Sequence, residues 1–375
     1  MSRTARIEEI QLAVEKVKSA AQAGKISSQS QAHIIRWLTE AGFEDGRPEL
    51  IDHIRQEKWE LLEDLFYTVI PFGTGGRRGR MYPFGTNAIN NRTIGESAQG
   101  LADYVRQTVR KPQLSCAIAY DTRHRSREFA ELSAEVMAAA GFQVYFLDGH
   151  RSTPEHSFSI RHFGCDCGIM VTASHNPPSD NAVKVYWSNG GQLVPPHDAG
   201  VIEAVQNVRE IRRIPFQEAV SRGQILFVQE EADRAFINAV LKQSFPGPRQ
   251  LRIVYSPLHG VGATAVVPVL SAAGFHDVHI FPDHAEPNGD FPNVPKNIAN
   301  PEVPDVFQTI LPFADRVGAD IVLATDPDCD RVGCAVRESS EPNSRWQLLT
   351  GNQIGALLTG EVIRRAIQRN RHLRD

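Results

Sequence analysis

The 375-residue chain has no long apolar run. No window approaches the roughly 18 consecutive apolar residues that cross a bilayer, and residues 1–20 lack the roughly 7–15-residue apolar stretch of a signal peptide. Basic residues are not in excess either, because 40 Lys and Arg stand against 44 Asp and Glu, a formal net charge of −4. We therefore expect a cytoplasmic chain whose partners include neither a membrane nor a nucleic acid.

Cysteine is also scarce. The chain has five cysteines in an odd-numbered, scattered set, Cys116, Cys165, Cys167, Cys329 and Cys334. Cys165 and Cys167 have no second Cys or His pair at the spacing of a zinc site, so no zinc site is predicted there. We expect most of the thiols to be small buried side chains.

The composition is otherwise that of an ordinary globular protein, with 41% hydrophobic and 22% charged residues. The length exceeds what one hydrophobic core serves, which predicts two or three domains. Changes in pattern along the chain set their expected bounds. These are a helical extension (1–65), a first α/β domain (66–215), a second α/β domain (216–345) and the start of an incomplete third (346–375).

Strand-like and helix-like segments alternate in both central domains, which is the signature of a layered α/β fold. In the first domain the expected strands are 116–120, 144–148 and 167–172, with a helix at 126–142. In the second they are 251–256, 278–281 and 320–325, with helices at 264–275 and 303–317.

The last segment poses a burial problem. A lone strand and helix cannot bury both of their apolar faces, so we expect the chain to be a truncated form or to depend on another surface. The helix expected at 352–368 should therefore drive self-association.

Residues 171–177, VTASHNP, follow a short apolar run. A hydroxyl in a loop after a strand can project into a cleft, which makes Ser174 a candidate carrier of a phosphoryl group. His175 is its neighbour, and adjacent side chains in an extended loop point apart, so a protease-like Ser-His pair is not expected. The alternative is an ordinary turn built by Asn176 and Pro177.

Three carboxylates follow another apolar run, at Asp326, Asp328 and Asp330. Alternate residues of an extended loop face one way, so these oxygens can converge on Mg²⁺ or Ca²⁺. An EF-hand is excluded, because Arg331 and Arg337 stand where Gly and Glu are required. Two alternatives remain: an acidic surface turn, and a similarity to haloacid-dehalogenase phosphatases in which Asp326 is the nucleophile.

Two further segments offer cationic groups. The loop 71–80, PFGTGGRRGR, is not a P-loop, because it lacks the Lys-Ser/Thr end, and it is not a dinucleotide fingerprint. Its glycines can bring backbone N–H groups to an anion, and Arg77 or Arg78 can grip phosphate oxygens, although a flexible surface turn also explains the glycines. Lys184 stands ten residues after Ser174 and can return to the same cleft, although most lysines are simply solvated.

Taken together, these segments resemble the α-D-phosphohexomutase superfamily of phosphoglucomutases and phosphomannomutases, and in particular its longer branch with an N-terminal helical extension. The similarity covers roughly residues 65–370. The segments that carry it are FGTGGRRG, YDTRHRS (120–126), TASHNPPSDNAVKVY, YSPLHGVG (255–262), EPNGDFPNVPKNIANPE (286–302), GADIVLATDPDCDR and LLTGNQIGALL. The resemblance implies tandem phosphohexomutase-type α/β domains with mixed sheets.

The resemblance also implies roles for single residues. Ser174 would be the phosphoserine that gives its phosphoryl group to a hexose phosphate and takes one back from a hexose 1,6-bisphosphate. A phosphate oxygen on Ser174 would share Mg²⁺ with the three aspartates, Asp326, Asp328 and Asp330. Proton transfer and phosphate contacts would fall to His175, Lys184, Arg78 and Arg331, whereas Asp121 and Arg123 would be mainly structural.

One departure from the family pattern concerns substrate binding. In the family a third-domain loop reads the sugar hydroxyls and a fourth domain holds the other phosphate, and residues 1–375 include neither. Remote binding groups lower the barrier at the reacting centre, so we expect impaired turnover of glucose or mannose phosphates, with partial reactions retained. The alternatives are a catalytically inactive relative that binds metal or sugar phosphate, and the aspartyl phosphatase.

Overall fold

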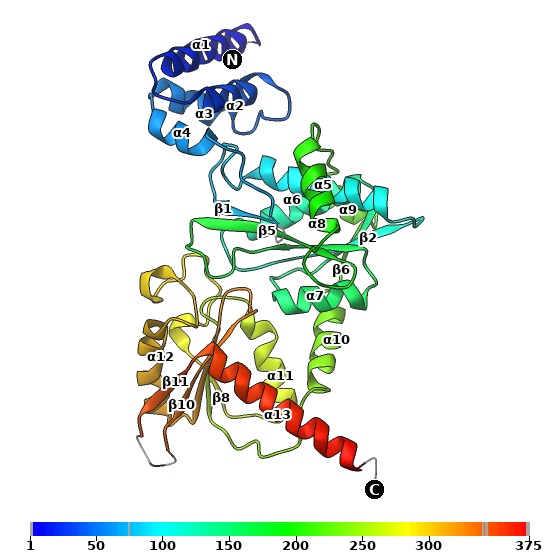
Figure 1. The fold of residues 1–375 in the computed structure, drawn as a ribbon, viewed down its shortest axis with the longest axis vertical. Coiled ribbons are helices and arrows are strands. Elements are labelled where there is room, and N and C mark those ends of the chain that lie inside the picture. Colours follow the sequence, from blue (N-terminus) through cyan, green and yellow to red (C-terminus); the bar gives the residue numbers. More distant parts are fainter. Residues whose placement is uncertain (1–2, 74–75, 340, 342–343, 373–375) are drawn as a thin grey trace.

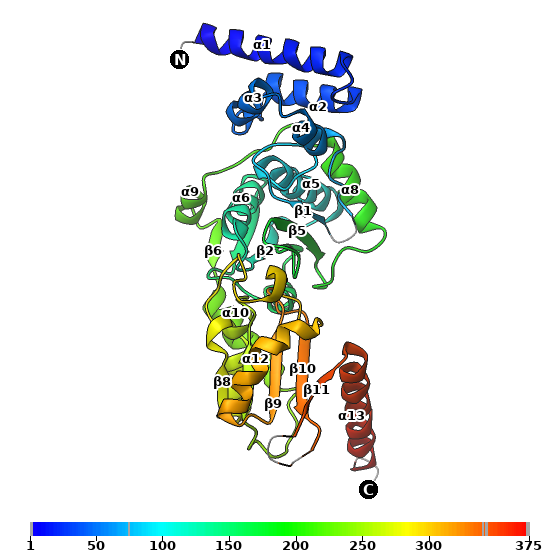
Figure 2. The same cartoon turned by 90° about the vertical axis from the view of Figure 1, so that its left-hand side faces the viewer.

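The structure, a computed structural model, describes residues 3–73, 76–339, 341 and 344–372. The chain forms an N-terminal helical segment and two α/β units, which follow one another along the long axis of the molecule (Figures 1 and 2). The predicted α/β fold with mixed sheets and a preceding helical segment is confirmed. Within the described residues, no helix combines the length and apolar character needed to span a bilayer.

The predicted N-terminal helical segment contains four helices. They are α1 (Arg3–Gln22), α2 (Ser28–Thr39), α3 (Arg47–Arg55) and α4 (Trp59–Phe66). Ser27 caps α2 by accepting a hydrogen bond from Ser30 N, and the helices share a core that includes Ile34, Leu50 and Leu62.

The first α/β unit is built on a six-stranded sheet in the order β1-β5-β4-β2-β3-β6. Its strands are β1 (Arg77–Arg80), β2 (Leu114–Tyr120), β3 (Phe142–Phe146), β4 (Cys167–Val171), β5 (Asp180–Trp187) and β6 (Ile225–Phe227). β2, β3, β4 and β6 run parallel, whereas β5 pairs antiparallel with both β4 and β1. The loops after the parallel strands therefore emerge at one edge of the sheet.

Helices cover both faces of this sheet (Figure 1). One face carries α5 (Asn91–Thr108), α6 (Ser126–Ala139), α8 (His197–Asn207) and α9 (Phe216–Ser221), and the other carries α7 (Thr153–His162) and α10 (Gln229–Leu241). α5 begins at a capping box in which Asn90 and Thr93 bond each other's backbone N–H.

The second unit has a five-stranded sheet in the order β11-β10-β9-β7-β8. Its strands are β7 (Ile253–Ser256), β8 (Val278–Ile280), β9 (Ile321–Thr325), β10 (Val332–Arg337) and β11 (Trp346–Leu349). Its helices are α11 (Val266–Ala272) and α12 (Pro304–Val317), with 3-10 turns at Gly262–Thr264, Pro282–His284 and Pro295–Asn297. α12 starts at Pro304, and the residue that follows its last one is Gly318, whose φ of 67° suits glycine.

The last element is α13 (Gly351–His372), which stands apart from the bulk of the second unit in Figure 2. Its apolar side chains are largely exposed, from 49% at Ile367 to 64% at Leu357. Arg365 stacks on the ring of Phe245, with the guanidinium carbon 4.3 Å from the ring centroid. The expected difficulty of burying this helix is thus visible in the structure.

Candidate active site

Ser174 lies in the loop that follows β4. Its amide donates to Thr172 Oγ1 at 2.9 Å, and its φ of 54° places it in the left-handed region, which is uncommon for a residue with a Cβ. The side chain is only 1% exposed. Unusual backbone conformations of this kind persist where surrounding contacts enforce them, and they cluster at functional sites.

The contacts that enforce this loop come from Arg123. Its Nε and Nη2 donate to Ser174 O at 3.1 and 2.6 Å, and its Nη1 donates to Pro177 O at 2.8 Å. A further carboxylate, Asp121, lies 3.6 Å from Nε. Arg123 is fully buried, so the guanidinium fixes the backbone on which Ser174 is carried.

The expectation that Ser174 and His175 point apart is wrong. Ser174 Oγ and His175 Nδ1 lie 3.2 Å apart, within hydrogen-bond distance. The expectation assumed an extended loop, whereas the left-handed turn at Ser174 brings the two side chains together. Burial, and then the positive charges of Arg331 and Arg78, lower the pKa of His175, which favours a neutral imidazole able to accept a proton.

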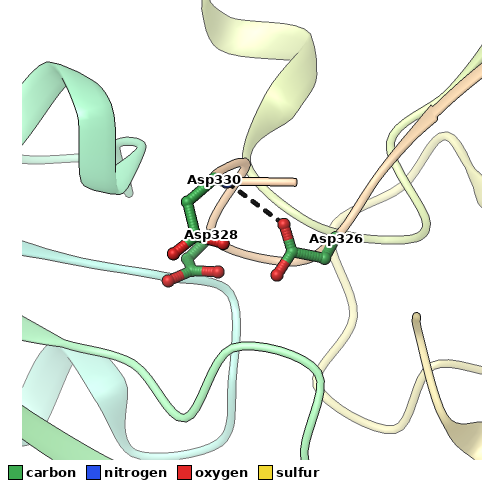
Figure 3. A group of neighbouring side chains, drawn as sticks. All are labelled: Asp326, Asp328 and Asp330. Carbon is green, nitrogen blue, oxygen red and sulfur yellow. Dashed lines mark hydrogen bonds between the residues drawn. The ribbon is translucent and has the colours of Figure 1, made fainter. Parts of the chain in front are cut away.

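The three aspartates lie in the loop between β9 and β10. Asp326, Asp328 and Asp330 each offer an oxygen within 4.8 Å of the others (Figure 3). The convergence was expected from alternation in an extended loop, but a tight turn produces it instead. Cys329 N donates to Asp326 O at 2.9 Å and Cys329 has a φ of 56°, while the amides of Asp330 and Arg331 donate to Asp326 Oδ1.

The two loops meet across the units. Ser174 Oγ donates to Asp326 Oδ2 at 2.7 Å. Lys184 reaches the same place from β5, with its Nζ 2.9 Å from Asp328 Oδ2 and 3.8 Å from Asp330 Oδ2. A hydroxyl, an ammonium group and three carboxylates, from segments about 150 residues apart in sequence, thus form one cluster.

The electrostatics of the cluster favour a cation. Burial, together with the neighbouring charges of Asp328 and Asp330, raises the pKa of Asp326 to about 9. For Asp328, burial alone would raise the pKa, but Lys184 and hydrogen bonds overcome it and hold the pKa at about 2. The three carboxylates therefore exceed the positive charge beside them, and a divalent cation could replace the proton that Asp326 keeps.

The donor set also fits a hard cation by geometry. Asp328 Oδ1 is buried and has no hydrogen-bond partner among the described residues. Each unpaired buried oxygen costs free energy unless a donor or an ion satisfies it. Carboxylate oxygens are the ligands that Mg²⁺ uses in proteins, so Asp326, Asp328 and Asp330 are suited to hold it.

The other two basic side chains predicted for the site, Arg78 and Arg331, lie at the edge of the cluster. Arg78 Nη1 donates to Asn176 Oδ1 at 3.3 Å and is exposed, and Arg331 Nε is 3.8 Å from Asp330 Oδ1. Arg77, the other candidate in the glycine-rich loop, is buried and pairs with Glu96 at 2.9 Å. Of the two loop arginines, Arg78 is therefore the one free to grip an anion.

The glycine-rich loop has a packing role. Gly76 has a φ of 113°, and a Cβ there would lie 1.9 Å from Val183 O. Glycine is thus required for the close approach of this loop to β5. Thr74 and Gly75 of the same loop lie outside the described residues.

One contact at the site was missed by sequence reasoning. Thr153, at the start of α7, donates from Oγ1 to Asp328 Oδ2 at 2.8 Å. A Ser-Thr-Pro segment signals only a helix start, and no local pattern links it to an aspartate 175 positions away.

Comparison with known proteins gives two family matches. The family model described as phosphoglucomutase/phosphomannomutase, alpha/beta/alpha domain I, matches residues 70–212, and the model of domain II matches residues 234–339. Both loops of the site fall inside these matched regions.

Individual relatives agree with the models. A phosphoglucomutase of Staphylococcus epidermidis is 34% identical over 310 residues, covering 82% of this chain and 55% of the relative. A phosphoribomutase of Saccharomyces cerevisiae is 31% identical over 339 residues, covering 84% of this chain and 53% of the relative. The chain thus spans about half the length of the curated relatives it matches.

The fold is also shared with a solved structure. A phosphoglucomutase/phosphomannomutase family protein from Burkholderia thailandensis superposes with a TM-score of 0.61 at 20% identity, covering 79% of this chain and 59% of that chain.

Proposed function

The chain belongs to the phosphoglucomutase/phosphomannomutase family of α-D-phosphohexomutases, and from this premise we propose that it moves a phosphoryl group between two hydroxyls of a sugar phosphate through Ser174. The observation that carries the proposal is the 2.7 Å contact between Ser174 Oγ and Asp326 Oδ2 inside the aspartate cluster. This contact supports the proposal because it brings the Ser174 hydroxyl next to carboxylates that could hold a cation.

The cation in this proposal is Mg²⁺, held by Asp326, Asp328 and Asp330 with an oxygen of the phosphate on Ser174. Bound there, it would neutralise charge on the transferring group. A phosphate on Ser174 removes the hydroxyl proton now donated to Asp326, which frees Asp326 Oδ2 for the metal. Lys184, Arg78 and Arg331 would contact the phosphate oxygens.

The reaction balances with the groups at the site. The bond between Ser174 Oγ and phosphorus breaks while the substrate hydroxyl forms a new bond to phosphorus, and the hydroxyl proton passes to His175, whose lowered pKa favours the neutral acceptor. The resulting bisphosphate turns over and returns its other phosphoryl group to Ser174. After the first transfer His175 passes this proton to Ser174 Oγ, which lies 3.2 Å from its Nδ1. In the return step His175 takes the proton back from Ser174 and gives it to the sugar oxygen that loses its phosphate.

The aspartyl-phosphatase alternative is less well supported. Both oxygens of Asp326 accept hydrogen bonds, Oδ1 from two amides and Oδ2 from Ser174. An aspartate nucleophile needs a free, ionised oxygen.

The expected test result is a phosphate on Ser174. After incubation with glucose 1,6-bisphosphate and Mg²⁺, peptide mapping by mass spectrometry should place one phosphate on that residue, and adding glucose 6-phosphate should discharge it. A phosphate mapped to Asp326, or inorganic phosphate released as fast as the phosphoenzyme is discharged, would instead favour the phosphatase. An unmodified Ser174 would reject the proposal.

Turnover and sugar preference need a separate assay. Conversion of glucose, mannose and ribose 1-phosphates should be compared, because a phosphoglucomutase and a phosphoribomutase match this chain at similar identity. We propose hexose phosphate as the preferred class. Phosphorylation of Ser174 without turnover would identify the impaired or inactive relative.

We also propose that the chain self-associates through α13. The exposed apolar residues of α13 are Leu357, Leu358, Val362, Ile363 and Ile367. Because water contact with such a face is unfavourable, light scattering should show oligomers that Leu358→Lys with Val362→Lys converts to monomer. Lysines at Gln308 and Asn207, exposed positions elsewhere, control for the added charge. A monomeric wild-type chain would contradict this.

A further inference from the structure

The side chain of Asp328, in the loop between β9 and β10, is held by a residue of the first α/β unit. Thr153 is the first residue of α7, and its Oγ1 donates to Asp328 Oδ2 at 2.8 Å while its amide donates to Asp328 O at 2.9 Å. Both residues are buried, with Thr153 8% exposed and Asp328 fully enclosed. One threonine of the first unit thus binds both the side chain and the backbone of the same aspartate in the second.

The two carboxylate oxygens of Asp328 have different surroundings. Asp328 Oδ2 accepts from Thr153 Oγ1 and from Lys184 Nζ, at 2.8 and 2.9 Å. Asp328 Oδ1 has no partner among the described residues although it is buried. Because rotation of the carboxylate would break both hydrogen bonds to Oδ2, Oδ1 is the oxygen left available for a cation.

Lys184 and Thr153 act on the carboxylate in different ways. The ammonium group supplies a charge as well as a hydrogen bond, so its removal alters the electrostatics of all three aspartates. Thr153 is neutral, so its hydroxyl adds a directed hydrogen bond without adding a net charge. Because Thr153 belongs to the unit that contains Ser174, its hydrogen bonds also hold the loop between β9 and β10 against that unit.

We propose that Thr153 is a positioning residue. It orients Asp328 for a divalent cation, and it holds the loop between β9 and β10 against the first α/β unit. The proposal rests on the metal site of the proposed function. Groups that hold metal ligands in place typically change metal affinity by about 10–100-fold when removed. Cation affinity should therefore depend on a hydroxyl that never touches the cation.

The test is direct binding of Mn²⁺, measured by calorimetry on the 375-residue chain. Thr153→Val keeps the shape and removes the hydroxyl, and it should weaken Mn²⁺ binding about 10–100-fold. Thr153→Ser restores the hydroxyl and should bind within a few-fold of the wild type. Ser159→Ala removes another buried hydroxyl of α7, which donates only to Glu155 O, and should leave binding unchanged.

Each outcome decides the assignment. Wild-type affinity in Thr153→Val would overturn it. An equal loss in Thr153→Ser, which keeps the hydroxyl and loses only the γ-methyl group, would also overturn it, because the effect would then not follow the hydroxyl. Circular dichroism checks that the variants fold. If the wild-type chain itself bound no Mn²⁺, the metal site of the proposed function would fall together with this assignment, whereas failure of the Thr153 assignment alone leaves that function standing.

Discussion

Replacing Ser174 with alanine is expected to abolish the phosphoenzyme and to lower turnover on the order of 10⁴-fold or more, as loss of a covalent nucleophile does in other enzymes. The change removes the donor to Asp326 Oδ2 but adds no strain, because serine and alanine both carry a Cβ at the φ of 54°. Because buried Asp326 Oδ2 loses its donor, we expect the free energy of unfolding to fall by about 1–3 kcal/mol. Mass spectrometry after glucose 1,6-bisphosphate treatment measures the phosphate, and a coupled assay measures turnover.

Ser179→Ala is the matched control for that experiment. Ser179 lies in the same loop and is exposed, and its hydroxyl donates only to Asp180 Oδ1, at 2.9 Å. It should keep both the phosphorylation and the turnover of the wild type. Phosphate that is still incorporated in Ser174→Ala, or a comparable loss in Ser179→Ala, would contradict the role given to Ser174.

The sequence alone predicted where the two loops begin but not how they are folded. Both follow apolar strands, β4 and β9, whose composition marks them as buried, so polar residues at their ends could be expected at a sheet edge. The shape of each loop was mistaken. Single residues in the left-handed region, Ser174 and Cys329, create the turns, and neither is a glycine that would have signalled one.

The meeting of the two loops was inferred from family resemblance rather than from physics. Periodicity describes neighbours three or four residues apart, whereas the contacts of Ser174 with Asp326 and of Thr153 with Asp328 span 152 and 175 positions. Such contacts depend on how two units dock. Helix ends were predictable only approximately, as the expected helix at 264–275 shows, since the structure has a 3-10 turn before α11.

Arg123→Gln is expected to lower the free energy of unfolding by about 3–5 kcal/mol, the usual cost of removing one member of a buried ion pair. The guanidinium donates to the carbonyls of Ser174, Asn176, Pro177 and Asp180 and faces Asp121. Glutamine offers too few donors to satisfy them. Arg123→Lys should not rescue the loss, because one ammonium group cannot span this set of carbonyls. Urea unfolding measures the change, and hydrogen exchange at residues 174–176 should show a loosened loop.

The loss in Arg123→Gln should also grow as the pH rises. Burial raises the pKa of Asp121 in the folded protein, and Arg123 opposes that rise. Without Arg123 the folded-state pKa climbs further above the unfolded value, so the folded state binds more protons, and its stability falls as pH increases through that window. The gap between variant and wild type should therefore be wider at pH 8 than at pH 5.

Arg127→Gln provides the comparison for Arg123→Gln. Arg127 is half exposed and pairs with Glu131 at 2.9 Å and Asp148 at 3.0 Å, so solvent screens the interaction and its removal should cost no more than about 1 kcal/mol. If the two arginine variants lost similar stability, or if Arg123→Gln left hydrogen exchange at Ser174 unchanged, Arg123 would not be the support of the loop that carries Ser174. A large loss of stability confined to Arg123→Gln, with faster hydrogen exchange at residues 174–176, would show that one buried guanidinium holds the left-handed turn at Ser174 in place.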